Sequence, residues 1–302
     1  LDKPADVVLM NGFEDDFVPK GATFTGKRKR ARSTMLRVAN CLLGEDLGDD
    51  TLIIGTSGRY EFKNKGIDVF LESLNRLNRD KDLKKKVLAF VNVPGWVGDP
   101  REDLQKRLKS KNKFTEPLQC PFITHWLHNM THDQVLDMLK YLGMGNRPED
   151  KVKVIFVPCY QDGHDGILNK HYYDLILGED LSVYPSYYEP WGYTPLESVA
   201  FRVPTITTDL AGFGLWVNSL KNQHGINDGV EVLHRSDYNY SEVADGIKDT
   251  VALFSTKTEA EIKEIRKRAG QVAEQALWKH FIQYYYEAYD IALRNAMKRQ
   301  LK

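Results

Sequence analysis

Short runs of β-branched and other apolar residues alternate along this chain with longer stretches in which apolar residues recur every three or four positions. This alternation is typical of βαβ units, in which helices join parallel strands and cover the sheet. Strands are predicted at residues 7–10, 51–55, 86–93, 152–157, 181–184, 204–208 and 230–234. The clearest helices are predicted at residues 28–43, 66–78, 132–141, 195–201, 240–254, 259–276 and 278–299. The pattern predicts an α/β fold with a Rossmann-like, mostly parallel sheet flanked by helices.

Two long connections interrupt the alternation. Residues 11–26 open with the turn dipeptide Asn11-Gly12 and continue through acidic and glycine-containing sequence, so an irregular connection is predicted there. Residues 94–122 contain several prolines and a basic run at residues 106–113, and they are predicted to leave the sheet as an exposed excursion. The basic run could meet a partner, although a solvated face is the simpler interpretation.

Composition narrows the class of protein. The 302 residues are 42% apolar and 28% charged, enough to bury a substantial core in one large domain or two smaller ones. Lys plus Arg and Asp plus Glu both number 42, so no nucleic acid or membrane partner is expected and any anion site must be local. No apolar run reaches the length of about 18 residues that spans a bilayer, and the first residues lack a signal-peptide profile, so a cytoplasmic protein is expected. The odd number and the spacing of Cys41, Cys120 and Cys159 indicate neither a disulfide framework nor a zinc site.

One loop after a predicted strand combines aromatic and acidic residues. In open α/β sheets, ligands bind beyond the carboxyl ends of the strands, so such loops are where chemistry is expected. The loop after residues 181–184 reads Pro-Ser-Tyr-Tyr-Glu-Pro-Trp-Gly-Tyr-Thr-Pro-Leu-Glu over residues 185–197. Thr194, Pro195 and Glu197 are predicted at the N-cap, N1 and N3 positions of the next helix, whose amino terminus would present backbone amides to a phosphate.

The two carboxylates of this loop admit different interpretations. Thr-x-x-Glu is also the pattern of a capping box, in which Glu197 would only accept a hydrogen bond from the Thr194 amide. Both interpretations of Glu197 stay open on local grounds. Glu189 lies in the aromatic stretch without a helical partner, and a carboxylate there can accept hydrogen bonds from sugar hydroxyls.

A second loop carries two cations. Residues 56–66, after the predicted strand at 51–55, read Thr-Ser-Gly-Arg-Tyr-Glu-Phe-Lys-Asn-Lys-Gly, with Arg59 and Lys65 six positions apart. A bidentate Arg together with a Lys point charge can hold a pyrophosphate and stabilise a departing phosphate. The alternative is a pair of ordinary solvated surface charges.

Three segments together resemble the signatures of the animal and fungal type of glycogen synthase. They are Tyr-Tyr-Glu-Pro-Trp-Gly-Tyr-Thr-Pro-Leu-Glu at 187–197, Gly-Arg-Tyr-Glu-Phe-Lys-Asn-Lys-Gly at 58–66 and Thr-Asp-Leu-Ala-Gly-Phe-Gly at 208–214. The resemblance extends in order over most of the chain. It implies a GT-B glycosyltransferase fold and transfer of glucose from UDP-glucose to the nonreducing end of an α-1,4-glucan with retention. It also implies that no metal and no cofactor is needed.

The resemblance assigns the catalytic and donor-binding side chains. Arg59 and Lys65 match the family's pair that binds the donor pyrophosphate and stabilises the UDP leaving group. Glu189 matches the first Glu of a Glu-x7-Glu motif, which contacts the transferred glucose and contributes to catalysis. Glu197 matches the second Glu, which holds the ribose.

The remaining donor contacts follow from the same resemblance. The backbone amides of Gly192, Tyr193 and Thr194 would meet the phosphates, in agreement with the helix-terminus argument. Tyr172 matches the aromatic residue that stacks on uracil, with its neighbour Tyr173 as the alternative.

The resemblance covers the carboxyl-terminal half of the family's sequences. It implies that residues 1–302 are a single Rossmann-like nucleotide-sugar-binding domain of a hexosyltransferase, inactive alone, whose acceptor surface lies mostly on a further, amino-terminal domain. Residues 1–26 are then expected to be a strand and connection near the interdomain hinge. Residues 278–302 are expected to be a terminal helix directed toward the missing domain, and the intact protein is a candidate homo-oligomer.

One departure from the family concerns regulation. Eukaryotic members carry an Arg-rich helix that binds glucose 6-phosphate, whereas only Arg266 and Arg268 fall in matching places here and Ile262 stands where the family has Arg. The prediction is a bacterial-type enzyme that glucose 6-phosphate does not activate.

Other interpretations stay open. The chain could be a stand-alone nucleotide-sugar-binding module without turnover, or a related glycosyltransferase with a different donor or acceptor. His125, His128 and His132, with Cys120 nearby, would lie on one face of a helix and suggest zinc, but no second thiol completes a site. Structural histidines are the preferred interpretation.

Overall fold

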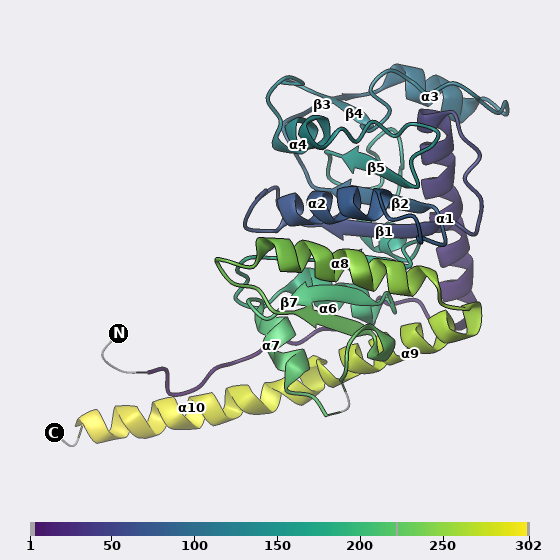
Figure 1. Cartoon of the computed structure of the whole chain (residues 1–302). Helices are drawn as coiled ribbons and strands as arrows, with labels where there is room; N and C mark the ends of the chain where they lie inside the picture. Colours follow the sequence, from purple (N-terminus) through teal and green to yellow (C-terminus); the bar gives the residue numbers. More distant parts are fainter. Residues whose placement is uncertain (1–3, 222, 301–302) are drawn as a thin grey trace.

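The computed structural model describes residues 4–221 and 223–300, with helices on both sides of a central sheet (Figure 1). Six strands form this sheet in the order β5-β2-β1-β6-β7-β8, and every neighbouring pair is parallel. The strands are β1 Leu52–Ser57, β2 Val87–Asn92, β5 Val152–Val157, β6 Leu181–Val183, β7 Thr205–Thr208 and β8 Val230–Leu233. The chain first builds outward from β1 through β2 to β5, and then returns to place β6 on the other side of β1. A topological switch point therefore lies between β1 and β6.

Both faces of the sheet are covered, which explains the nearly continuous apolar runs of β1, β2 and β5. Every residue of β2 and β5 is buried. Alternate residues point to opposite faces: Ile54 and Ala89 join one core cluster, whereas Ile53 and Leu88 join another. Strands buried on both faces need apolar side chains at successive positions, which is the pattern of a parallel sheet in an α/β protein.

The helices divide among three core clusters. The first cluster takes α2 Ile67–Asn78, α4 Gln134–Leu142 and α8 Tyr240–Ser255. The opposite face takes α1 Gly21–Leu43, α3 Glu102–Lys109 and α5 Tyr172–Ile176. A third cluster, below β6 to β8, gathers α6 Tyr193–Ala200, α7 Gly212–Asn218, α9 Glu259–Gln275 and the start of α10 Trp278–Gln300. The helix α10 then runs away from the body of the molecule (Figure 1).

The excursion at residues 94–122 contains more regular structure than its prolines predict. It includes β3 Val97–Pro100, which pairs antiparallel with β4 His125–Leu127, and the basic run lies largely in α3. The side chain of Arg101 is fully buried and donates hydrogen bonds to the backbone carbonyls of Cys120 and Ile123, at 2.8 and 3.1 Å. A buried cation thus ties the excursion together, which sequence periodicity does not reveal.

The predicted strand at residues 7–10 is wrong. No strand forms there, and Val8 is 81% exposed. Instead, Phe13 pairs with the junction of α9 and α10, where its N–H donates to the carbonyl of Ala276 and its own carbonyl accepts from Trp278. Gly12 packs so closely on Trp278 that a side chain at this position would clash with the ring. The amino-terminal apolar run lacks a neighbouring strand because this junction holds the segment outside the sheet.

Some helix boundaries also differ from the prediction. The first helix begins at Gly21, seven residues before the predicted start, and α6 begins at Tyr193 rather than Pro195. The short helices α5 and α7 and the three-residue 3-10 helix Ile226–Asp228 were not predicted. By contrast, α9 begins at the predicted residue, where Thr258 and Glu261 form a capping box.

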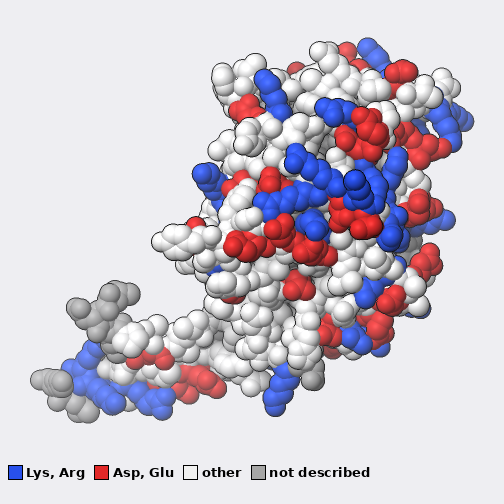
Figure 2. Space-filling model, in the orientation of Figure 1, with Lys and Arg blue, Asp and Glu red and all other residues white. Residues whose placement is uncertain are grey.

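Charge and cysteines agree with the composition. On the face seen in Figure 2, groups of Lys and Arg lie beside groups of Asp and Glu, as expected for a chain without net charge. Cys41, Cys120 and Cys159 are all free. Among the described residues, no helix is both long enough and apolar enough to cross a membrane. The cytoplasmic location stays a prediction.

Candidate functional site

The two loops singled out in the sequence lie side by side at the switch point. One loop, residues 58–66, follows β1, and the other, residues 185–192, follows β6. The N–H of Tyr187 donates a 2.7 Å hydrogen bond to the carbonyl of Asn64, which joins the loops directly. Ligands of open α/β sheets bind at such a point, because the loops on either side of it diverge and leave a crevice.

Gly66 allows the loops to meet. Its φ is +66°, a conformation that favours glycine, and a side chain at this position would clash with the carbonyl oxygen of Pro185. Pro185 begins the second loop directly after the last strand residues, so any bulk at position 66 would push the loops apart. The glycine at the end of the first loop is therefore a requirement of the site's geometry.

Lys65 and Glu189 face each other across the crevice. Their side chains form an ion pair between Nζ and Oε2, and they are only 15% and 18% exposed. Arg59 differs: its side chain is 74% exposed, and its Nε lies 3.1 Å from Oε1 of Glu61. The structure thus brings the predicted Lys65 and Glu189 into contact and leaves Arg59 at the open edge.

The backbone of Glu189 is held on both sides. Its N–H donates to the carbonyl of Leu210, and its carbonyl accepts from the N–H of Gly212, at 3.2 and 3.1 Å. A side chain on Gly212 would clash with the carbonyl of Pro190. The segment 208–214, matched in the sequence only as part of a signature, therefore acts as a brace for the Glu189 loop.

Glu197 is not part of a capping box. The N-cap of α6 is Gly192, with φ of 107°, and Thr194 lies within the first turn without capping it. The Glu197 carboxylate instead accepts a 2.8 Å hydrogen bond from the hydroxyl of Tyr173. Burial raises the pKa of Glu197, while this hydrogen bond opposes the rise. The capping-box interpretation is wrong because a glycine in the left-handed region starts the helix two residues earlier.

The first turn of α6 still offers backbone donors. The amides at the start of any helix lack partners one turn earlier, and the positive end of the helix dipole lies with them. In α6 these amides belong to the segment that begins with Tyr193 and Thr194. The predicted anion-binding character of this helix start therefore keeps its physical basis, with the helix beginning slightly earlier.

A cavity of about 270 Å³ opens beside these groups. The residues that line it come from the ends of β1, β2 and β5 and from α5 and α6: Ser57, Gly58, Arg59, Asn92, Pro94, Cys159, Tyr160, Gln161, Tyr172 and Thr194. Oγ of Ser57 donates a 3.1 Å hydrogen bond to the hydroxyl oxygen of Tyr172, and burial raises the pKa of this tyrosine well above its usual value. The cavity joins an aromatic wall to a cationic edge.

The neighbouring tyrosines face different surroundings. Tyr172 lines the cavity, whereas the ring of Tyr173 stacks on Phe201, with ring centroids 5.2 Å apart and planes at 4°. Tyr173 thus combines core packing with its hydrogen bond to Glu197. Of the two residues left open by the sequence, only Tyr172 is placed to contact a ligand in this cavity.

One further residue supports the site and was not singled out in the sequence. It is Arg235, whose guanidinium lies 5.5 Å from the ring centroid of Tyr187 at the start of the aromatic loop. Arg235 follows β8, far from the loop in sequence, and its isolated position among polar residues gives no signal.

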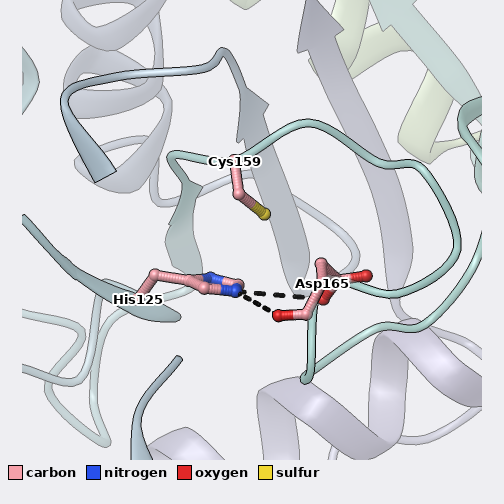
Figure 3. A group of neighbouring side chains, drawn as sticks. All are labelled: His125, Cys159 and Asp165. Atoms are coloured by element: carbon pink, nitrogen blue, oxygen red, sulfur yellow. Dashed lines mark hydrogen bonds and ion pairs between the residues drawn. The ribbon is translucent and has the colours of Figure 1, made fainter. Parts of the chain in front are cut away.

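The histidine spacing that suggested zinc, which was not the preferred interpretation, does not produce a metal site among the residues that the structure describes. His125 lies in β4 rather than in a helix, so its spacing to His128 and His132 does not place the three side chains on one helix face. Cys159 and Asp165 approach His125 instead, with candidate ligand atoms within 4.8 Å of one another (Figure 3).

Hydrogen bonds within the chain already occupy this second group. The Nε2 atom of His125 lies 2.7 Å from the backbone carbonyl of Asp165 and must carry the ring proton, so its lone pair is not free for a metal. The Asp165 carboxylate accepts three backbone N–H groups, from Ile167, Leu168 and Asn169. Burial raises the pKa of Cys159 to about 12, which disfavours the thiolate that zinc requires. The group fits a structural role in folding the loop at 162–169.

Comparison with solved structures identifies the fold. The chain is similar to WaaG, a glycosyltransferase of lipopolysaccharide biosynthesis, with a TM-score of 0.51 and 14% identity over 94% of this chain and 55% of that one. It is equally similar to HepE of Anabaena, solved with UDP and glucose, with a TM-score of 0.51 and 16% identity over 95% of this chain and 57% of that one. The fold is that of the Rossmann-like domains of GT-B glycosyltransferases.

Sequence comparison identifies the family to which the chain belongs. Residues 42–101 and 97–302 match the family model described as glycogen synthase, and the chain belongs to that family. It is 28% identical to the glycogen [starch] synthase of Neurospora crassa over 82% of this chain, and 29% identical to isoform 2 of Saccharomyces cerevisiae over 84%. It is also 32% identical to the Caenorhabditis elegans protein over 62% of this chain. The chain spans less than half the length of these relatives: 42%, 44% and 35%.

Proposed function

We propose that this chain binds UDP-glucose at the β1/β6 edge of its sheet. It would serve as the donor-binding part of a retaining, metal-independent hexosyltransferase that extends the nonreducing end of an α-1,4-glucan. The observation that carries the proposal is the convergence of Lys65, Glu189 and the start of α6 beside a cavity lined by Tyr172. Membership of the glycogen synthase family and the UDP and glucose bound by HepE support the choice of donor.

The cavity and its surroundings suit each part of the donor. Uracil would stack on Tyr172, and the ribose hydroxyls would donate to the carboxylate of Glu197, which Tyr173 orients. The diphosphate would extend toward the start of α6 and Lys65, so that the glucose reaches Glu189.

The proposed chemistry is departure of UDP from the glucosyl carbon. The bond from this carbon to the β-phosphate oxygen breaks while a bond to the acceptor hydroxyl oxygen forms on the same face. Negative charge develops on the departing phosphate, which takes up the proton of the attacking hydroxyl. Lys65 and Arg59 would stabilise that charge in the transition state, as fixed cations do most effectively where water is excluded. The glucose hydroxyls would be held by Glu189 during the transfer. We propose that the acceptor is bound mainly by residues outside these 302, and that the chain alone binds donor without turnover.

Calorimetric titration of the chain with UDP and UDP-glucose tests the donor site. We expect saturable binding that Arg59→Ala and Glu197→Ala each weaken by about tenfold, because each removes a charged contact to the ligand. Arg294→Ala and Glu287→Ala, on the exposed surface of α10, are matched controls and should leave affinity unchanged. Absence of nucleotide binding in the folded chain would contradict the proposal.

A further inference from the structure

The ion pair between Lys65 and Glu189 lies where the diphosphate and the glucose of the donor would be joined. In the free chain each side chain neutralises the other, and both are more than four-fifths buried. Under the proposed function, on which this inference rests, Lys65 would contact the phosphate and Glu189 would contact the glucose. Donor binding would therefore replace one internal contact with two contacts to the ligand.

Only one of the two partners is free to change its position readily. The backbone of Glu189 is fixed by the hydrogen bonds to Leu210 and Gly212, and its side chain is shorter than that of lysine. Lys65 reaches the carboxylate through a four-carbon chain that passes beside Gly58, with Cε 4.0 Å from where a side chain on that glycine would begin. A phosphate in the crevice would therefore draw Lys65 away, while the carboxylate of Glu189 stays close to its held backbone.

UDP-glucose and UDP differ in whether they leave one of the two charged side chains without a partner. With UDP-glucose, the phosphate compensates Lys65 and the sugar hydroxyls compensate Glu189. With UDP alone, Lys65 is taken by the phosphate and Glu189 is left largely buried without a partner. Removing one member of a buried pair is costly because the remaining charge is uncompensated. The terminal phosphate of UDP also carries additional negative charge, which a nearby carboxylate repels.

We infer that Glu189 acts as a discriminator against UDP through its contact with Lys65. The carboxylate competes with the bare nucleotide for the lysine, and this competition is relieved only when a sugar occupies Glu189. After glucose transfer, Glu189 forms its ion pair with Lys65 again, and this promotes the release of UDP. The same residue thus favours the substrate over the product of the proposed reaction.

The loop offers a control for this inference. Glu61 pairs with Arg59 as Glu189 pairs with Lys65, but Arg59 is 74% exposed and Glu61 is 34% exposed, so solvent screens their interaction. Glu61→Gln and Glu189→Gln each remove one negative charge beside a cation of the same loop. General electrostatic attraction for a nucleotide would change similarly in both variants, whereas competition for a buried lysine would change only in Glu189→Gln.

The experiment is calorimetric titration of the wild-type chain and both variants with UDP and with UDP-glucose. We expect Glu189→Gln to bind UDP about tenfold more tightly and UDP-glucose no more tightly than wild type, so that the preference between the ligands moves toward UDP. Glu61→Gln should change the affinity for UDP by less than about twofold. Circular dichroism spectra that match wild type would show that the near-isosteric substitutions leave the fold intact, since loss of the buried ion pair by itself lowers the unfolding temperature of Glu189→Gln.

The outcomes separate the two proposals. Unchanged or weaker UDP binding by Glu189→Gln, with wild type binding UDP, would overturn the discriminator role and leave the donor site standing. A similar gain in both variants would overturn it too, because long-range charge would then be the cause. No UDP binding by the wild-type chain or either variant would refute the donor site itself.

Discussion

At the scale of single residues, Tyr173 shows how a neighbour of the cavity can control it without lining it. Its hydroxyl donates to Glu197, and its ring is stacked on Phe201 and lies 5.0 Å from the ring of Phe17. The carboxylate is buried, which raises its pKa, and the tyrosine hydrogen bond favours the charged form. A ribose hydroxyl would donate a stronger hydrogen bond to that charged form than to a protonated carboxyl.

Tyr173→Phe should therefore weaken UDP binding and shift its pH dependence. Loss of the hydrogen bond raises the pKa of Glu197 further, so protonation sets in at a higher pH and the loss of affinity on acidification begins earlier than in wild type. Titrations with UDP across the acid range measure this shift. A uniform loss of affinity at every pH would indicate that Tyr173 only packs against the core.

At the scale of elements, the site depends on how closely two strand-to-helix loops approach. Gly66 and Gly143 provide a comparison, since their φ values are +66° and +68°. A side chain on Gly66 would clash with the backbone of Pro185, whereas a side chain on Gly143, at the end of α4, has nothing within 4 Å. The two positions share a left-handed backbone conformation, and they differ in whether an added side chain would meet neighbouring atoms.

Gly143→Ala should reduce the free energy of unfolding by about 1 kcal/mol, the cost of a left-handed non-glycine residue. Gly66→Ala should cost about 2 kcal/mol more, because backbone must shift, and should also weaken UDP binding by separating the loops. Urea unfolding of both variants measures the difference. Equal losses of stability would show that the loops do not rely on this close contact.

At the scale of the whole molecule, a second charged region lies at the amino ends of β1 and β6, away from the cavity lined by Tyr172. A cavity of about 840 Å³ between α1 and α9 is lined in part by Arg28, Arg32 and Arg266. Asp180 already pairs with Arg28 and Arg32, at 2.6 and 2.7 Å. These arginines lower the pKa of the Asp180 carboxyl against the effect of its burial. An internal carboxylate thus provides the anion that the guanidinium groups of Arg28 and Arg32 would otherwise attract.

That glucose 6-phosphate does not activate the intact protein stays a prediction. Stimulation should stay below about fivefold, the lower end of ordinary allosteric coupling. Glucose transfer measured with and without the sugar phosphate is the test, and strong stimulation would refute the prediction.

Much of the sheet could be predicted because its strands are buried on both faces. The strand at residues 152–157 is confirmed residue for residue, since a short, mostly apolar run between polar borders is typical of a strand in a buried parallel sheet. The apolar run at residues 7–10 failed because pairing depends on a neighbouring strand, which no local pattern reveals. The five-residue helix α5 escaped prediction because so short a helix shows little periodicity.

The candidate site was predictable in its loops and not in its contacts. Arg59, Lys65 and Glu189 stood out because polar groups after buried strands collect at one edge. The ion pair between Lys65 and Glu189 joins residues 124 positions apart, and the hydrogen bond from Tyr173 reaches Glu197 from another element. Such contacts depend on the order of the strands in the sheet, so the local sequence does not predict them.

The pairing of β1 with β6 has a consequence for how the chain acquires its site. The β1 strand pairs with β2 early in the chain order, but Ile54 must wait for Leu181 to complete the switch point. Contacts between residues so distant in sequence close large loops and form late in folding. A chain emerging from the ribosome would carry Lys65 long before its partner Glu189 was made. Nucleotide would then stabilise only chains in which β6 has paired with β1, and would not stabilise a folding intermediate that lacks this pairing.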